Sequence, residues 1–272
     1  MTGSDSGLEF SFNRVAAMVR RYWYLLRSSW PRVLDLIYWP TVQMLMWGFL
    51  QLYVSQQSGL FVRAGGVFIG AVLLWDILFR GQLGFSVSFL EEMWSHNLGN
   101  LMMSPLRPVE FIAALMIMSI IRLAIGMVPV TLLAVAFFGF NLWSLGLALA
   151  AFFVNLILTS WAIGIFVAGL LLRNGMGAES MAWTIMFLFL PLTCVYYPVT
   201  VLPSVLQYVA WALPPTYVFE GMRALLIDHV FRADLMLEAL AFNVALFAAA
   251  SVAFLKLLQS ARVQGSLLQA GE

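Results

Sequence analysis

Long runs of apolar residues constrain this chain more than any other feature of its sequence. Six stretches hold about 20 or more predominantly apolar residues, the length that a helix needs to cross the roughly 30 Å hydrocarbon core of a bilayer. The strands of a membrane barrel would instead alternate in short segments. The sequence therefore predicts an all-α membrane protein with six transmembrane helices, whose approximate ranges are 33–53, 65–89, 111–138, 143–172, 181–202 and 235–258.

Composition supports this class and weakens others. Hydrophobic residues make up 62% of the 272 residues and charged residues only 10%, whereas soluble domains carry about 25% charged residues. The net charge of +1 gives no reason to expect a nucleic acid as partner. The single cysteine, Cys194, cannot form a disulfide within the chain, and the sequence indicates neither a metal nor a redox site.

The distribution of basic residues predicts the orientation in the membrane. An even number of spans places both termini on one side. That side holds nine basic residues (Arg14, Arg20, Arg21, Arg27, Arg32, Arg107, Arg173, Lys256 and Arg262) and the other holds three (Arg63, Arg223 and Arg232). Because the side richer in arginine and lysine is normally cytoplasmic, we expect both termini and the loop at 90–110 in the cytoplasm.

The segment 10–30 precedes the first span and is amphipathic. Apolar residues recur at helical spacing on one side and arginines occupy the other; they are Phe12, Val15, Val19, Tyr22 and Leu26 against Arg14, Arg21 and Arg27. This pattern predicts a helix that lies at the inner membrane surface and ends at Pro31, with Trp23 and Trp30 as interfacial anchors. The alternative is a charged tail that only sets topology.

The loop between the second and third spans is polar and amphipathic, in contrast to its surroundings. We predict a helix over 91–103. Its apolar stripe consists of Trp94, Leu98, Leu101 and Met102, and its polar groups are Glu91, Glu92, His96 and Asn100. Such a helix is suited to docking against a soluble partner, with the polar groups pairing across the interface. The alternative is a helix that lies on the surface without a partner.

A long segment joins the fifth and sixth spans. Over 198–234 it has prolines at 198, 203, 214 and 215 with apolar residues between them. It is too apolar for a solvated loop and too broken for a full span. We expect short re-entrant helices on the outer side, buried against the bundle.

With these elements in order, the chain resembles an ABC-2-type transporter permease. The loop motif of that family appears as Glu92, Leu101, Ser104, Pro105, Leu106, Pro108 and Glu110, and its motif before the last span as Pro214, Thr216, Tyr217 and Arg223. The loop departs from the family pattern at His96 and Asn97, where a Gly-Thr pair is usual. The resemblance implies one transmembrane domain over 1–272, a dimer of permease subunits, and a separate ATPase that docks on the coupling helix at 91–103. It also implies that spans two and five line the substrate cavity, where Trp75, Phe79, Phe187 and Phe189 lie.

The chain carries no ATPase motif of its own. A phosphate-binding loop has the pattern Gly-x-x-x-x-Gly-Lys-Ser/Thr, and the one lysine, Lys256, has no glycine loop before it. We therefore expect no cofactor in this chain, with ATP and Mg on the partner subunit.

Charges within the spans are costly and need partners. Asp76 and Arg80 are four residues apart on one helical face, so they fit either an internal ion pair or groups that line the substrate pathway. Arg122 has no partner nearby in sequence and needs one elsewhere, or water. Glu220 and Arg223 are three apart and are expected to form a structural pair.

The function that follows from the resemblance is ATP-driven export of a lipid-like, lipid-linked glycan or amphipathic drug-like molecule. A homodimer is expected, with a heterodimer left open, and the expected location is a bacterial inner membrane. Two other classes remain. A membrane enzyme acting on lipid needs convergent polar groups, yet the two histidines, His96 and His229, fall on opposite sides. A motor-free ion-coupled carrier or channel often shows a broken helix in each of two matching halves, and here a break occurs only near the fifth span.

Overall fold

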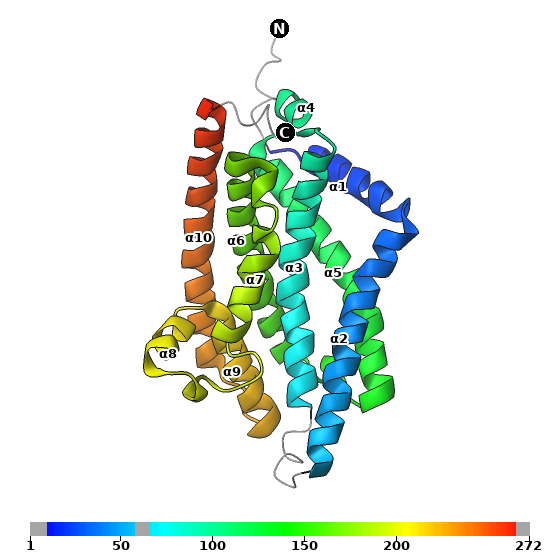
Figure 1. Cartoon of the computed structure of the whole chain (residues 1–272), viewed down its shortest axis with the longest axis vertical. Coiled ribbons are helices and arrows are strands. Elements are labelled where there is room, and N and C mark those ends of the chain that lie inside the picture. The colour runs from blue at the N-terminus through cyan, green and yellow to red at the C-terminus, as the bar shows by residue number, and fades with distance from the viewer. Residues whose placement is uncertain (1–9, 58–65, 265–272) are drawn as a thin grey trace.

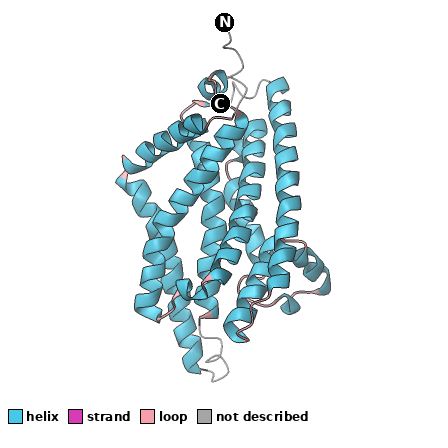
Figure 2. Cartoon of the chain, turned by 180° about the vertical axis from the view of Figure 1, so that it is seen from behind, coloured by secondary structure: helices cyan, strands magenta, loops and turns pink. Residues whose placement is uncertain are grey.

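The computed structural model describes residues 10–57 and 66–264, and these form helices joined by short loops (Figure 2). Arg63, counted above for orientation, lies outside the described residues. The α-helices are α1 (Phe12–Arg27), α2 (Trp30–Gln57), α3 (Val67–Trp94), α4 (Leu98–Met103), α5 (Pro108–Phe138), α6 (Leu147–Asn174), α7 (Met181–Leu192), α8 (Ser204–Trp211), α9 (Pro214–Ile227) and α10 (Ala233–Gln264).

The long helices run side by side, and α3 is the centre of the bundle (Figure 1). It contacts α2, α5, α6, α7 and α9. Its most apolar window is 72% buried, whereas the corresponding windows of α2 and α10 are only 17% buried. The apolar sides of α2 and α10 therefore face outward, as expected of helices in contact with lipid or a partner subunit.

Five helices are long and apolar enough to cross a membrane, and they correspond to five of the six predicted spans. Their ranges are Trp30–Val54, Val67–Trp94, Pro108–Phe138, Leu147–Ala178 and Ala233–Ala261. The prediction that Pro31 ends the first helix is wrong, because α1 already ends at Arg27 and Pro31 lies in the first turn of α2. Proline is tolerated there because the amide it lacks would have no partner within the helix.

The continuous helix predicted over 181–202 is not confirmed. In its place α7 has 12 residues, about 18 Å at 1.5 Å per residue, which is too short to cross the bilayer alone. Pro191 is the penultimate residue of α7, and Cys194 beyond it has a left-handed backbone with a φ of 54°. The chain therefore turns soon after Leu192, although its sequence stays apolar.

Close helix contacts hold the bundle together where small or polar side chains meet. A Cβ added at Gly84 of α3 would lie 3.1 Å from the Cα of Ser119 in α5, so these helices touch at their backbones. Between α6 and α10, the Thr159 hydroxyl donates to Asn243 Oδ1 at 2.6 Å, and Asn243 Nδ2 donates to the carbonyl oxygen of Asn155 at 3.0 Å. Small residues and interhelical hydrogen bonds of this kind are typical of association within a membrane.

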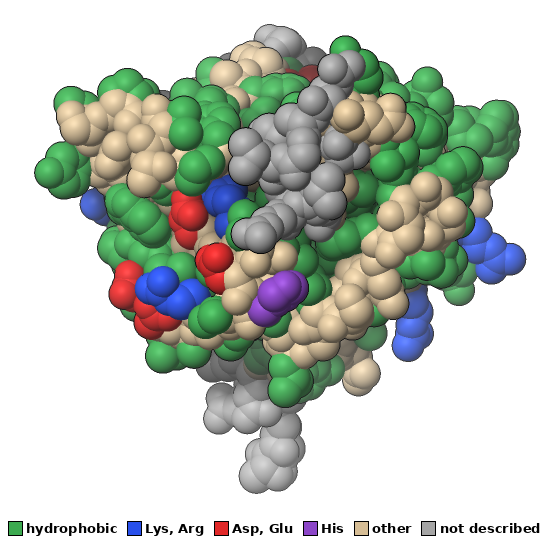
Figure 3. Space-filling model, turned by 90° about the horizontal axis from the view of Figure 1, so that it is seen from below, with side chains coloured by type: hydrophobic (Ala, Val, Ile, Leu, Met, Phe, Trp, Pro, Cys, Tyr) green, Lys and Arg blue, Asp and Glu red, His purple; other side chains and the backbone are tan. Residues whose placement is uncertain are grey.

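The segment between α7 and α10 folds back as α8 and α9 at one end of the bundle (Figure 1). Most of α9 from Pro214 to Arg223 is buried. The predicted pair of Glu220 and Arg223 is confirmed at 2.9 Å. Seen from this end, hydrophobic side chains cover much of the surface, and charged ones form separate small groups on both sides of it (Figure 3).

Candidate functional site

The predicted coupling segment lies at the opposite end of the bundle, beside α1 and the start of α5 (Figure 1). It is not one helix over 91–103 as predicted. Residues 91–94 are the last turn of α3, a turn follows at Ser95, His96 and Asn97, and α4 begins at Leu98. His96 has a φ of 50°, a conformation that an α-helix cannot contain, so the chain changes direction there.

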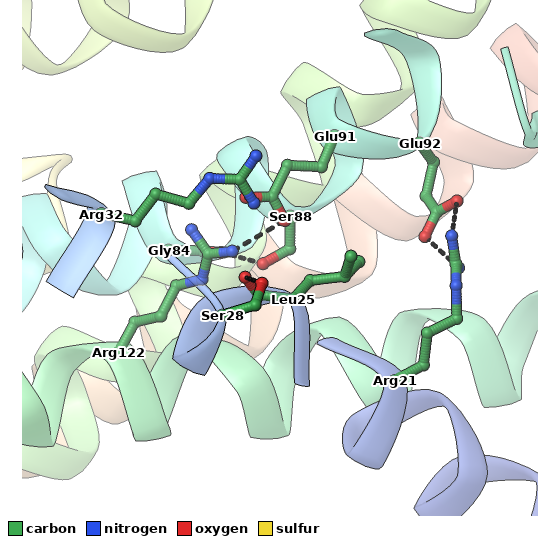
Figure 4. Close-up of polar contacts among 9 residues, drawn as sticks. All are labelled: Arg21, Leu25, Ser28, Arg32, Gly84, Ser88, Glu91, Glu92 and Arg122. Carbon is green, nitrogen blue, oxygen red and sulfur yellow. Dashed lines mark hydrogen bonds and ion pairs between the residues drawn. The ribbon is translucent and has the colours of Figure 1, made fainter. Parts of the chain in front are cut away.

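Glu92 is buried, and its side chain is engaged within the chain. The two terminal nitrogens of Arg21 in α1, Nη1 and Nη2, donate to its carboxylate oxygens, as Figure 4 shows. The bond from Nη2 is 3.0 Å long. Asn97 Nδ2 donates to the same carboxylate at 2.8 Å. Glu92 therefore ties α1 to the end of α3 and to the turn before α4, and in this arrangement it does not present a charge to a partner protein.

Glu91 joins two other helices. Arg122 of α5 donates to its Oε2 at 2.8 Å, and Arg32 of α2 lies 3.5 Å from its Oε1. Figure 4 shows both arginines converging on this carboxylate. The partner that Arg122 requires is therefore a residue 31 positions away at the end of α3.

A third carboxylate, Glu110 at the start of α5, holds the beginning of α1. It accepts hydrogen bonds from Arg14 Nε at 2.8 Å and Nη2 at 2.6 Å, and from the backbone nitrogens of Ser11 at 2.8 Å and Arg107 at 3.0 Å. This hydrogen bonding raises the pKa of the Arg14 guanidinium. Two predicted members of the polar face of α1, Arg14 and Arg21, thus form ion pairs with the bundle.

The opposite side of α1 packs against the bundle. Val15, Met18, Tyr22 and Leu26 are buried. Burial raises the pKa of the Tyr22 phenol far above its usual range, and the nearby Glu92 carboxylate adds to the shift, so Tyr22 stays neutral. Phe12, which belongs to the predicted apolar face, is instead exposed.

The apolar stripe predicted on the loop contacts the chain itself. Leu98 is buried and Leu101 packs against the core, while the side chain of Met102 lies outside the described part. The outward surface is formed by Trp94, His96, Asn100 and Met103, of which Met103 is 81% exposed. Because of their exposure, these four are the residues that a partner would contact first. The predicted docking role stays a prediction for the whole set named from the sequence, which is Glu91, Glu92, Trp94, His96, Leu98, Leu101 and Met102.

Three of the four aromatic residues predicted for the pathway lie together. The ring centroid of Phe79 is 5.9 Å from that of Trp75 and 6.0 Å from that of Phe187. Trp75 is buried in the bundle, whereas Phe187 is 61% exposed on α7. Phe189 is partly buried against the core. Only Phe187 thus presents most of its ring outward, and contact of these rings with a substrate stays a prediction.

Asp76 and Arg80 form the internal pair that their spacing suggested. Arg80 Nε lies 3.5 Å from Asp76 Oδ1, and both side chains are largely buried. The three arginines from α1 and α2 that pair with glutamates, namely Arg14, Arg21 and Arg32, were not foreseen as partners. The available signal was that Glu91, Glu92 and Glu110 flank the ends of spans where isolated carboxylates are costly.

Comparison with protein families finds a match over most of the chain. The profile of the ABC-2 type transporter family matches residues 14–227, which extend from the first turn of α1 to the end of α9. A comparison with curated proteins found no match. Members of the family form the permease part of ABC transporters and generally work with a separate ATPase subunit. The chain therefore belongs to the ABC-2 type transporter family and is the transmembrane component of an ABC transporter.

Proposed function

We propose that the chain is the permease subunit of an ATP-driven exporter in a bacterial inner membrane. It would move a lipid-like, lipid-linked glycan or amphipathic drug-like substrate, as a homodimer with two separate ATPase subunits that carry the ATP and Mg. The observation that supports this most is the exposed surface of Trp94, His96, Asn100 and Met103 at the end of a bundle that matches the family over most of its length.

The proposed membrane arrangement has six crossings and both termini in the cytoplasm. The five long helices supply five crossings, and α7 with the residues after it supplies the remaining one. In this arrangement α1 lies at the inner surface, α4 faces the ATPase, and α8 and α9 re-enter the outer leaflet.

The ion pairs suggest how the ATPase would move the permease. Any force on α4 reaches α3 through the short turn at 95–97, and Glu92 links that turn to α1 through Arg21 and Asn97. Arg14 and Glu110 extend the link to α5. ATP binding would thus shift α1, α4 and the adjoining ends of α3 and α5 as one unit and rock the two permease subunits against each other.

Variants with one added cysteine test the orientation. The native Cys194 is buried, so Met103→Cys and Asp228→Cys each add one exposed thiol at opposite ends of the bundle. A membrane-impermeant maleimide is expected to label Asp228→Cys in right-side-out vesicles and Met103→Cys only in inside-out vesicles. The reverse pattern would contradict the proposed orientation.

Crosslinking from the same position tests the docking surface. A maleimide–benzophenone probe on Met103→Cys is expected to capture a subunit with a phosphate-binding loop when native membranes are irradiated. The control is Val263→Cys, which is 83% exposed near the end of α10 at the same end of the bundle. Equal capture from both positions, or capture from Val263→Cys alone, would remove the loop from the proposed interface.

A further inference from the structure

A charged hollow lies between α2, α3 and α5, on the side of the bundle where Arg32 and Arg122 converge on Glu91. Its volume is about 240 Å³. Its charged lining consists of Arg32, Asp35, Arg80, Glu91 and Arg122. Drug-sized ligands occupy pockets of about 300–1,000 Å³, so this hollow suits one polar group rather than a whole amphipathic molecule.

Arg80 is the most unusual residue of the lining. It lies 13 residues from Val67 and 14 from Trp94, so it sits at the middle of a membrane-length helix. Its side chain is only 10% exposed. Its Nε is buried without a hydrogen-bond partner among the described residues, and its ion pair there is with Asp76 at 3.5 Å, while Asp35 adds a weaker attraction. A guanidinium at this depth is costly unless its N–H donors meet an acceptor.

Arg122 repeats the pattern on the facing helix. One of its terminal nitrogens donates to Glu91, but its buried Nε has no partner among the described residues. The carboxylates nearby do not meet this demand. Glu91 is shared between Arg122 and Arg32, and Asp35 is exposed on α2. Two largely buried arginines, each with an Nε that has no partner among the described residues, therefore line one small hollow.

We propose that this hollow binds a phosphate group, and that the group belongs to the headgroup of a lipid-like substrate. Arginine matches phosphate because its planar fork donates two parallel hydrogen bonds to two oxygens. The rest of the lining is uncharged and mostly apolar, so apolar surface adjoins the charged groups, as an amphipathic phosphate ester requires; it consists of Leu36, Leu83, Gly84, Val87 and Trp94. The proposal rests on the proposed export function and narrows its substrates to phosphate-bearing amphiphiles.

Binding to the purified full-length chain tests the proposal without an ATPase. The probes are dioleoyl phosphatidic acid and dioleoylglycerol, which share both acyl chains and differ by the phosphate, and bound lipid is counted by native mass spectrometry. The wild type is expected to prefer phosphatidic acid. Arg80→Gln and Arg122→Gln are each expected to weaken that binding about ten- to a hundredfold, as loss of hydrogen bonds to a charged group implies, with dioleoylglycerol unaffected.

The matched control is Arg173→Gln, an exposed arginine near the end of α6, which should bind phosphatidic acid like the wild type. The double variant Asp76→Asn, Arg80→Gln removes both charges of the buried pair, so it stays informative if Arg80→Gln alone fails to fold. Wild-type affinity in the folded double variant, or equal binding of the two lipids by the wild type, would overturn the proposal.

A competition arm separates the possible sources of the phosphate. If inorganic phosphate displaces phosphatidic acid, phosphate recognition is supported and a free phosphate compound becomes the ligand. If it does not, while the arginine variants lose binding, a lipid headgroup is supported. Because this assay needs no ATPase, its failure is distinguishable from failure of the Met103 crosslink.

Discussion

Arg223→Leu is expected to lower the melting temperature of the purified protein sharply, because Arg223 holds the turn after α7 against α9. Its Nη1 donates to the carbonyl oxygen of Cys194 at 2.9 Å, and its Nη2 donates to Glu220 at 2.9 Å. Glu220 in turn accepts from the backbone nitrogen of Val199 at 2.8 Å. Leucine fills similar space but removes the positive charge that pairs with the largely buried Glu220 and the donor to the carbonyl of Cys194, a residue with a left-handed backbone. Removing one member of a buried pair costs about 3–5 kcal/mol.

The neighbouring Arg232 provides the matched control. It pairs with Asp234 at 2.5 Å, but both side chains are about half exposed, and exposed pairs contribute about 0–1 kcal/mol. Thermal unfolding followed by tryptophan fluorescence should therefore show a large shift for Arg223→Leu and a small one for Arg232→Leu. Similar shifts in the two variants would contradict a structural role for Arg223.

Glu110→Gln is expected to release the first turns of α1 from the bundle. The carboxylate is fully buried and accepts from Arg14 and from the backbone nitrogens of Ser11 and Arg107. Glutamine has nearly the same shape but no charge and one acceptor oxygen fewer, so the Arg14 fork loses its bidentate partner. We expect the free energy that holds α1 against the bundle to fall by about 3 kcal/mol, because hydrogen bonds to a charged group contribute about 1.5–3 kcal/mol each.

Limited trypsin digestion measures this release directly, because α1 carries Arg14, Arg20, Arg21 and Arg27 as cleavage sites. Cleavage within α1 should be faster in Glu110→Gln than in the wild type. Asp234→Asn, which alters an exposed carboxylate in a pair with arginine, should leave that rate unchanged. An unchanged rate in Glu110→Gln would mean that packing alone holds α1 in place.

The long helices were predictable because an apolar run of membrane length has few other ways to satisfy its backbone. The end of α7 could not be predicted in this way, because the sequence around Cys194 stays apolar although the chain turns there. Amphipathic spacing correctly indicated that the loop has an apolar side, but spacing alone does not say what covers it. In the structure, Leu98 and Leu101 pack against the helices of their own chain and are not exposed to a partner.

The long-range ion pairs could not be predicted from the sequence, for a similar reason. Asp76 with Arg80, and Glu220 with Arg223, lie within one helical turn and were foreseen from their spacing. Arg21 lies 71 residues from Glu92. Such a pairing depends on how α1 packs across the bundle, which the chain's periodicity does not encode.

Purification of the tagged chain from its native membranes in mild detergent, with its partners identified by mass spectrometry, shows whether a separate ATPase works with this permease. We expect that a separate subunit with a phosphate-binding loop is recovered, and that Met103→Glu, but not Val263→Glu, releases it. Repeated recovery of the intact permease without any such subunit would contradict the claim that an external ATPase drives this protein.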